Sequence, residues 1–321
     1  MTNAMATLMN DKPKAPWIGV GENGEWSTVE EAMRVCGLDF TVETKDLKFQ
    51  YEDDSNPDLV YYGNVPGLVA NVRSDSHSLM GCVSNTYQLV QNQEIFSMLE
   101  PFIEAGGKVT AGGVTAQGLC FMVVTMEDAN FGGDAYTLNV MATNSFNGQF
   151  PASLICSPVR IVCQNMYRQL MKNTDNVARF RHSLNIGGKL DAMKAAYAMF
   201  GDYKSDFGMY IERLKDRKAK HSIEEVVEYM YPYTNTDPNS PRFDYSKDNV
   251  DEKRALYINK YYNSSTNSNF GTCFALVNSY YDYVSHDVPV RKNDIEYRDQ
   301  RFSKLVGGTM VKPKILSFMN E

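Results

Sequence analysis

The sequence predicts an α+β protein, in which an antiparallel sheet with the order β-β-α-β-β-β-α is followed by a helical C-terminal part. Several segments before residue 186 alternate apolar and polar residues, which is typical of strands. Asparagine- and glycine-rich turns separate these segments. After residue 186, apolar residues recur at every third or fourth position, which is typical of helices. We therefore predict an N-terminal extension (1–58), a β-rich core (59–186) and a helical part (187–321).

The N-terminal extension is expected to contain a helix and a hairpin or strand. Ser27 and Glu30 have the spacing of a capping box and Gly37 follows ten residues after Ser27, so residues 28–36 form a predicted short helix. Alternation over 38–51 predicts a strand or hairpin. The pattern G-x-G-x-x-G at 19–24 occurs in dinucleotide sites, but there it follows a buried strand and opens a helix. Neither is predicted here, so we expect a plain turn.

The core is predicted to be one twisted antiparallel sheet with its helices on one face. Its predicted strands span 59–72, 79–90, 118–126, 136–146 and 153–163, and residues 177–184 are a candidate for a further strand. Its predicted helices span 92–105 and 164–172.

The helical part begins with a long apolar stripe. The stripe consists of Leu190, Met193, Tyr197, Phe200, Phe207, Ile211 and Leu214. We expect Gly201 and Gly208 to bend or interrupt this helix, because glycine weakens helices. Residues 234–249 are polar, contain two prolines and show no periodicity, which predicts a mobile loop. A second stripe between Phe270 and Val284 predicts another helix.

The composition favours a soluble protein of the bacterial cytoplasm. No apolar run approaches the ~20 residues that a membrane helix needs, and the N-terminus lacks a signal-peptide pattern. The six cysteines form no C-x-x-C pair, and four of them, Cys36, Cys120, Cys156 and Cys163, lie in apolar strings. Buried reduced thiols in a reducing compartment are therefore expected.

No motif in the sequence argues for a cofactor, a metal or an enzymatic activity. The P-loop pattern is missing, and the four histidines lack ligand spacing. We expect His286 to lie at a helix C-terminus, where a cation is favoured. Cys163 is expected to pack in the core, with a nucleophile paired to a distant histidine as the alternative. A two-metal nuclease stays open, because scattered carboxylates are plentiful.

Charge is distributed unevenly along the chain. Residues 159–220 contain 13 lysines and arginines against 6 aspartates and glutamates, whereas residues 1–158 contain 7 against 19. A positive segment in a protein of net charge −7 predicts a local anionic partner. A solvated basic helix face is the alternative.

The beginning of the positive segment has the residue types of a site for single-stranded nucleic acid. Such sites combine cations that contact phosphates with flat side chains on which bases stack. We predict that the site consists of Arg160, Asn165, Tyr167, Arg168, Lys172, Arg179, Arg181, His182 and Lys189. In a strand, Arg179 and Arg181 would share one face. Alternatively, these arginines are solvated or anchor the acidic N-terminal part.

The same residues carry a family resemblance. The run Pro158 to Asn165, together with Arg179 to His182, resembles the phage- and plasmid-associated family known as domain of unknown function 932. Further agreement lies at Trp17 with Gly19 and Gly21, at Leu79 to Val83 with Tyr87, Gln91, Asn92 and Phe96, and at Gly271 to Asn278 with Tyr283 and His286. Ile18 departs from the family, where a histidine is expected. The resemblance implies a mobile genetic element and no settled activity.

The predicted element order is also similar to that of phage single-strand annealing proteins of the RecT, Red-beta and Erf class. That similarity implies rings or filaments that hold single-stranded DNA in a basic groove without ATP. We therefore expect a homo-oligomeric, mobile-element protein that binds single-stranded DNA and anneals strands in recombination, and that is not an enzyme. The alternatives are an anti-defence module that binds a protein, and an uncharacterised nuclease or nucleotide-processing enzyme.

Overall fold

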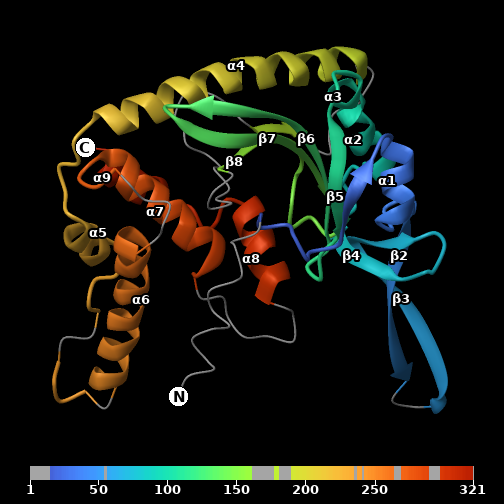
Figure 1. Ribbon diagram of the computed structural model, residues 1–321. Coiled ribbons are helices and arrows are strands. Elements are labelled where there is room, and N and C mark those ends of the chain that lie inside the picture. The colour runs from blue at the N-terminus through green and yellow to red at the C-terminus, as the bar shows by residue number, and fades with distance from the viewer. Residues whose placement is uncertain are drawn as a thin grey trace, which may run out of the picture.

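The protein contains two antiparallel sheets and a set of helices, as Figure 1 shows, and the predicted α+β class is confirmed. The computed structural model describes residues 15–53, 56–160, 177–180, 189–234, 237–240, 242–263, 269–288 and 297–320. No helix in these ranges combines the length and the apolar character that crossing a bilayer requires.

The larger sheet has six strands in the order β1-β5-β6-β7-β8-β9, and every neighbouring pair is antiparallel. Its strands are β1 (Glu22–Trp26), β5 (Lys108–Val114), β6 (Leu119–Phe131), β7 (Asp134–Ser145), β8 (Ala152–Arg160) and β9 (Val177–Phe180). Residues 152–159 of β8 are all buried. The centre of this sheet is thus covered on both faces.

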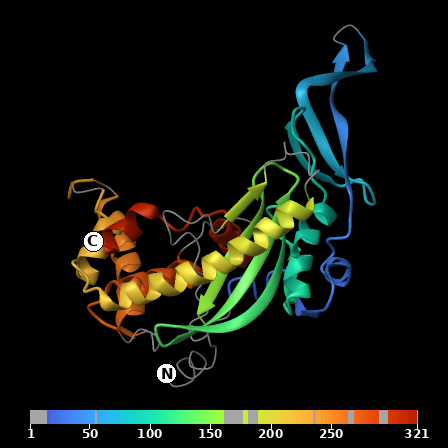
Figure 2. The ribbon, with the colours of Figure 1, turned by 90° about the horizontal axis from the view of Figure 1, so that it is seen from above.

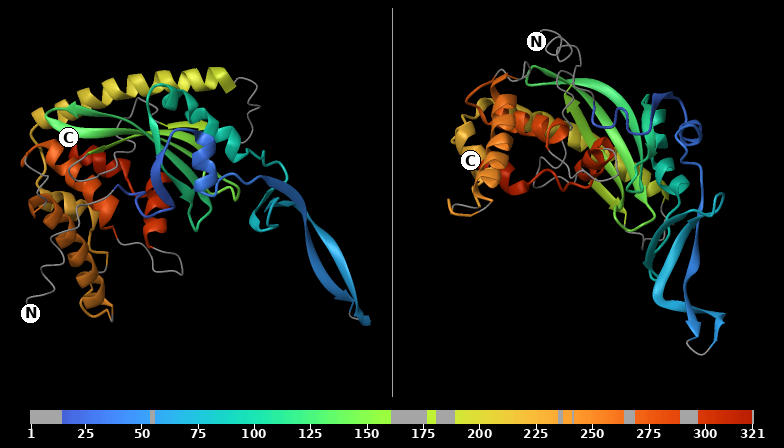
Figure 3. Two further views of the ribbon diagram at one scale, coloured as in Figure 1. Left: turned by 45° about the vertical axis from the view of Figure 1, so that its right-hand side comes forward. Right: turned by 90° about the horizontal axis from the view of Figure 1, so that it is seen from below.

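The smaller sheet consists of β2 (Val42–Asp53), β3 (Asn56–Arg73) and β4 (Leu79–Ser84). Strand β4 pairs with β3 only over Leu68 to Val72. Beyond that point β2 and β3 continue as a two-stranded ribbon, residues 47–53 and 56–67, which we call the arm. Figures 2 and 3 show the arm projecting away from the rest of the molecule.

A bulge separates the arm from its root, which is the three-stranded part where β4 pairs with Leu68 to Val72 of β3. Asp46 pairs with Val69 and Lys48 with Asn64, so β3 has extra residues at this point. They include Pro66, which cannot donate to the ladder, and Gly67, whose φ is +75°. Bulges of this kind bend a strand, which is consistent with the direction of the arm in Figure 3.

Helices cover the two faces of the six-stranded sheet. The helical elements are α1 (Val29–Val35), α2 (Asn92–Phe96), η2 (Ser97–Leu99), α3 (Glu100–Glu104), α4 (Lys189–Asp216), α5 (Ile223–Met230), α6 (Phe243–Asn263), α7 (Cys273–His286), α8 (Tyr297–Val306) and α9 (Pro313–Met319). Helix α4 runs across one face, and α7 and α8 lie on the opposite side (Figure 1). Phe207 of α4 packs on Tyr136 of β7, whereas Phe302 of α8 packs on Phe121 of β6.

The sheet differs from the prediction in two respects. The sequence analysis missed β1 and β5, and it placed β3 and β4 in the main sheet although they form a separate one with β2. Strand β5 contains Gly112 and Gly113 and has little alternation, so it lacks the usual signal of a strand. A Cβ atom on Gly112 would lie 2.9 Å from the sulfur of Cys36, because α1 approaches closely here.

Three helix predictions also need correction. The single helix predicted at 92–105 is divided into α2, η2 and α3, with Pro101 in the first turn of α3. Helix α4 passes through Gly201 and Gly208 without interruption. Helix α6 begins at Phe243, so the end of the predicted loop 234–249 is helical. The helix predicted at 164–172 lies outside the described residues.

The structure corrects one detail of the predicted N-terminal helix. The cap of α1 is Thr28, whose hydroxyl accepts a hydrogen bond from the Glu31 amide at 3.2 Å, so the predicted Ser27 is one residue too early. The glycine pattern 19–24 leads into strand β1 and not into a helix, as expected for a plain turn. Ser222 and Glu225 form a reciprocal capping box at α5.

The cysteines behave mainly as small buried apolar residues. Cys36, Cys120, Cys156 and Cys273 are free and buried, whereas Cys82 is exposed. Cys163 lies outside the described residues.

Candidate functional site

Three of the nine predicted nucleic-acid-binding residues lie in the described part of the chain, and two of these belong to β8 and β9, at one edge of the six-stranded sheet. Arg160 is the last residue of β8, Arg179 belongs to β9 and Lys189 begins α4. Six others, Asn165, Tyr167, Arg168, Lys172, Arg181 and His182, lie outside the described residues.

Strand register places Arg160 and Arg179 far apart along this edge. Arg160 pairs with Tyr136 of β7, and Arg179 pairs with Ser153 of β8. Ser153 and Arg160 are seven residues apart on one extended strand, which corresponds to about 23 Å. The two arginines thus mark the ends of a line along β8 and do not form a compact cluster.

Strand β9 is the last strand of the sheet in the described part of the chain, with β8 as its neighbour there. An edge strand leaves the backbone N–H and C=O groups on its outer side unpaired, whereas a central strand pairs its groups on both sides. At the other end of β8, Arg160 pairs with Tyr136 of β7. The ring of Tyr136 packs edge-to-face on Phe207 of α4, with 5.2 Å between the ring centroids. Helix α4 therefore fixes this end of the edge.

A polar stripe crosses the face of the sheet opposite α4. The hydroxyls of Thr110 and Thr125 lie 2.8 Å apart, and Thr125 donates to the Asn139 side-chain carbonyl at 2.8 Å. The Asn139 amide reaches the carbonyl oxygen of Ser157 at 3.3 Å. The hydroxyl of Ser157 is buried and lacks a hydrogen-bond partner among the described residues. The sequence analysis missed this stripe, although these residues interrupt the apolar runs of neighbouring strands.

A group of charged side chains, of which Asp282 is buried, joins α6 to the end of α7. The ammonium of Lys260 lies 3.3 Å from Asp282 and 3.0 Å from Asp287. Burial raises the pKa of Asp282, although Lys260 opposes that effect. Burial also acts to lower the pKa of Lys260, but the two carboxylates together raise it above its ordinary value. His286 lies in the last turn of α7, at the helix end where it was expected.

Tyrosine hydroxyls link these two helices to one another and to the end of α5. The hydroxyls of Tyr231 and Tyr283 are 2.8 Å apart, and Tyr257 donates to the Leu276 carbonyl at 3.0 Å. Burial raises the pKa of Tyr257 and of Tyr283 well above the ordinary value for phenols. These phenols are neutral near pH 7, and they hold α5, α6 and α7 together.

The described residues also outline a hollow of about 280 Å³ beside α1. Its lining is mainly polar and includes Thr28, Glu30, Glu31, Arg34, Asp39 and Gln93. None of the predicted site residues lines it. In the part of the chain that the structure describes, no three histidine, cysteine or acidic side chains are arranged to hold a metal ion.

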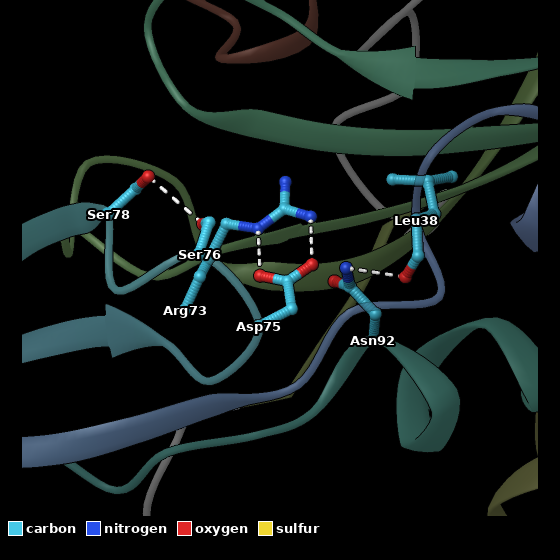
Figure 4. Close-up of polar contacts among 6 residues, drawn as sticks. All are labelled: Leu38, Arg73, Asp75, Ser76, Ser78 and Asn92. Carbon is cyan, nitrogen blue, oxygen red and sulfur yellow. Dashed lines mark hydrogen bonds and ion pairs between the residues drawn. The ribbon is translucent and has the colours of Figure 1, made fainter.

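The root of the arm is held by an ion pair within a tight turn, shown in Figure 4. The guanidinium of Arg73 donates to both carboxylate oxygens of Asp75, at 3.0 and 2.7 Å, and lies 4.0 Å above the ring of Phe40. The hydrogen bond from Arg73 holds the pKa of Asp75 well below its usual range. In the same turn His77 adopts a φ of +55°, which is rare for a residue other than glycine.

A buried polar seam connects the arm root to the six-stranded sheet. Asn92 donates to the Leu38 carbonyl at 3.1 Å (Figure 4) and accepts from the Asn144 amide at 3.1 Å. Gln91 bonds both backbone groups of Val42, at 3.0 and 2.8 Å. The motif containing Gln91 and Asn92 thus has a structural explanation, since buried polar groups need partners.

Comparison with known proteins agrees with the resemblance in the motifs. Residues 79–306, which include β5 to β9 of the main sheet and the helices from α2 to α8, match the family described as Domain of unknown function (DUF932). The chain therefore belongs to this family. No curated protein and no solved structure matches it significantly.

Proposed function

We propose that this protein binds single-stranded DNA along the β8–β9 edge and the segment between β8 and α4. The observation that carries the proposal is the charge of residues 159–220, where 13 cationic residues stand against 6 acidic ones in a chain that is acidic elsewhere. Phosphate contact requires such an excess. The distance of about 23 Å between the positions of Arg160 and Arg179 along β8 suits a linear ligand better than a compact one.

The proposal extends to annealing and assembly. We propose that copies of the chain associate into rings or filaments in the cytoplasm of a host cell, and that they pair complementary strands without ATP during recombination of a mobile element. The absence of a P-loop pattern from the sequence supports the ATP-independent step.

Binding is tested by fluorescence anisotropy of a labelled oligo-dT over a range of salt concentrations. The logarithm of affinity is expected to fall with log salt at a slope of about −0.7 per phosphate neutralised. The double substitution Arg179→Ala with Arg181→Ala is expected to flatten that slope by roughly one or two units. Oligo-dT and mixed sequence are expected to bind similarly, because stacking tolerates any base.

A matched control removes two cations elsewhere. Arg34 on α1 and Lys304 on α8 are exposed, and their replacement by alanine is expected to leave the slope unchanged. If Arg179 and Arg181 instead anchor the acidic N-terminal part, the variant that lacks both of them loses thermal stability, and the wild type binds no single-stranded DNA at low salt. That result overturns the proposal.

A protein-binding module without a DNA role is a second candidate, because the arm exposes aromatic side chains on both faces. An anti-defence protein that captures a host component would need such a surface. In that case the wild type fails to bind DNA and a host protein protects the arm from labelling.

A further inference from the structure

We propose that the arm is a docking element that seats on the basic end of α4 in a second copy of this chain. The inference extends the proposed self-association and does not depend on DNA binding. It assigns one surface to each side of the contact.

The arm exposes apolar surface on both of its faces. Phe49, Tyr51 and Tyr61 form a stack on one face, with ring centroids 5.8 and 5.5 Å apart. The ring of Phe49 lies over Gly63, where a Cβ atom would be 2.7 Å from it. Tyr62 follows Tyr61 on the strand and therefore points to the other face, where its side chain is 68% exposed.

A ribbon of this kind is poorly stabilised by itself. Two-stranded hairpins are at best marginally stable in water, and a third strand or a covered face is usually required. Within the described residues β4 supplies a third strand only at the root, over Leu68 to Val72. A contiguous exposed apolar surface marks an interaction site. The arm is thus built to be covered by another molecule.

The charge of the arm indicates which kind of surface covers it. Residues 47–53 and 56–67 contain one lysine, no arginine and three acidic residues, Glu52, Asp53 and Asp58. A two-stranded ribbon fits a DNA groove by shape, but an acidic ribbon repels phosphates. The partner surface is therefore basic.

The chain carries a basic surface at the end of α4. Arg213, Arg217, Lys218 and Lys220 are all exposed there, with Glu212 and Asp216 as the acidic residues among them. Lys215 is engaged, since it pairs with Asp134 of β7. Helix α5 follows with Glu224 and Glu225, so the positive surface is confined to residues 213–220.

The two surfaces cannot meet within one molecule. Helix α4 ends beside α5 and α9, whereas the arm projects from the opposite end of the protein in Figures 1 and 2. The contact must therefore join different copies. Because unlike surfaces meet, the association is head-to-tail and gives a ring if the rotation closes, or a filament if it does not.

Sedimentation velocity over a concentration series tests the docking surfaces without DNA. The wild type is expected to form dimers and higher species. Tyr62→Ser removes an exposed ring and leaves the stack of Phe49, Tyr51 and Tyr61 in place, and it is expected to weaken association at least tenfold. Tyr245→Ser on α6, a ring that is 75% exposed, is the matched control and is expected to have no effect.

A charge exchange identifies the contact directly. Glu52→Lys with Asp53→Lys makes the arm positive, and Lys218→Glu with Lys220→Glu makes the end of α4 negative. Each variant alone is expected to remain monomeric, because like charges meet. An equimolar mixture is expected to restore dimers and higher species, because both contacts between the two variants join opposite charges.

The outcomes distinguish the proposed arm contact from the more general proposal of self-association. Association that is unaffected by either pair of charge substitutions overturns the arm contact and leaves self-association intact. A wild type that stays monomeric at every concentration overturns both, while the anisotropy measurement judges DNA binding independently. Circular dichroism establishes that each variant is folded, and an unfolded Tyr62→Ser protein leaves the charge exchange to decide.

Discussion

The two antiparallel sheets use the same strand pairing and differ in what covers them. In the six-stranded sheet, α4 packs on one face and α8 on the other, so strands such as β8 are buried on both sides. In the three-stranded sheet the arm has aromatic side chains exposed on both faces. Backbone pairing alone thus does not set the stability of a sheet, since burial of its side chains is the main favourable term. The covered sheet supports the fold, and the uncovered one is available for an interaction.

The largest expected difference between the two sheets comes from removing one ring from each. Phe207 is fully buried and packs on Tyr136 at 5.2 Å and on Phe131 at 5.3 Å between ring centroids. Phe207→Ala is expected to lower the free energy of unfolding by about 3–5 kcal/mol, because it leaves a cavity. Urea denaturation of dilute protein measures the change.

Tyr62→Ser is the counterpart in the arm. Because this ring is largely exposed, the substitution is expected to change the free energy of unfolding by only about 0.5 kcal/mol. Equal losses for Phe207→Ala and Tyr62→Ser would show that the arm is part of the core, and would break the comparison.

Two glycines in α4 provide a sharper test of how closely the helix approaches the sheet. A Cβ atom on Gly208 would lie 2.8 Å from the Phe131 ring, whereas a Cβ atom on Gly201 would have no neighbour within 4 Å among the described residues. Gly208→Ala is expected to destabilise by roughly 1–3 kcal/mol through overpacking. Gly201→Ala is expected to stabilise by about 0.5–1 kcal/mol, because alanine favours helix.

Thermal denaturation of the two glycine variants measures these effects. Opposite signs at two positions seven residues apart on one helix would locate the contact with β6. Stabilisation by both substitutions would show that α4 does not lie against Phe131.

The buried tyrosines predict how the covered part of the molecule responds to alkali. Burial raises the pKa of Tyr280 and of Tyr210 from 10.0 to about 12. The phenol stays protonated in the folded state while it ionises in the unfolded chain. The stability that it contributes is complete below pH 10 and is lost as the pH rises from 10 through about 12.

Urea denaturation at a series of alkaline pH values measures this loss. For Tyr280→Phe the number of protons released on unfolding is expected to fall by about one. The exposed Tyr245→Phe serves as the control. An identical pH dependence in wild type and Tyr280→Phe would contradict the burial of this phenol.

The smallest expected effect is a difference in thiol reactivity between the two sheets. Cys82 in β4 is exposed. Burial raises the pKa of Cys36 to about 11 and those of Cys120 and Cys156 to about 12, so little thiolate forms at these positions. A thiol-specific reagent is expected to modify Cys82 rapidly in the native protein, because the thiolate is the reactive form.

Substitution shows which thiol reacts. Cys82→Ser is expected to remove one rapidly reacting thiol, and Cys120→Ser is expected to remove none. Rapid modification of Cys120 in the native state would indicate that the centre of the main sheet opens frequently.

The sequence by itself determined the α+β class, the strands with strong alternation and the long amphipathic helices. It also determined the family motifs and the position of the positive segment, because charge and periodicity are local properties that can be counted along a chain. Strand β5 did not follow, because its glycines leave little alternation. The 3-10 turn Ser97–Leu99 that divides the predicted helix did not follow either, because it keeps the helical spacing of the apolar residues.

Only the tertiary structure decided which strands share a sheet and which glycines are confined. Strands β3 and β4 look no different from those of the main sheet in sequence, yet β4 ends early and leaves the arm uncovered. Gly201 and Gly208 look equivalent, and only contact with Phe131 distinguishes them. The predicted site became a line along β8 in the same way, since pairing between residues distant in sequence sets the separation of Arg160 from Arg179. Such long-range pairing depends on the whole packed chain and leaves no local signal in the sequence.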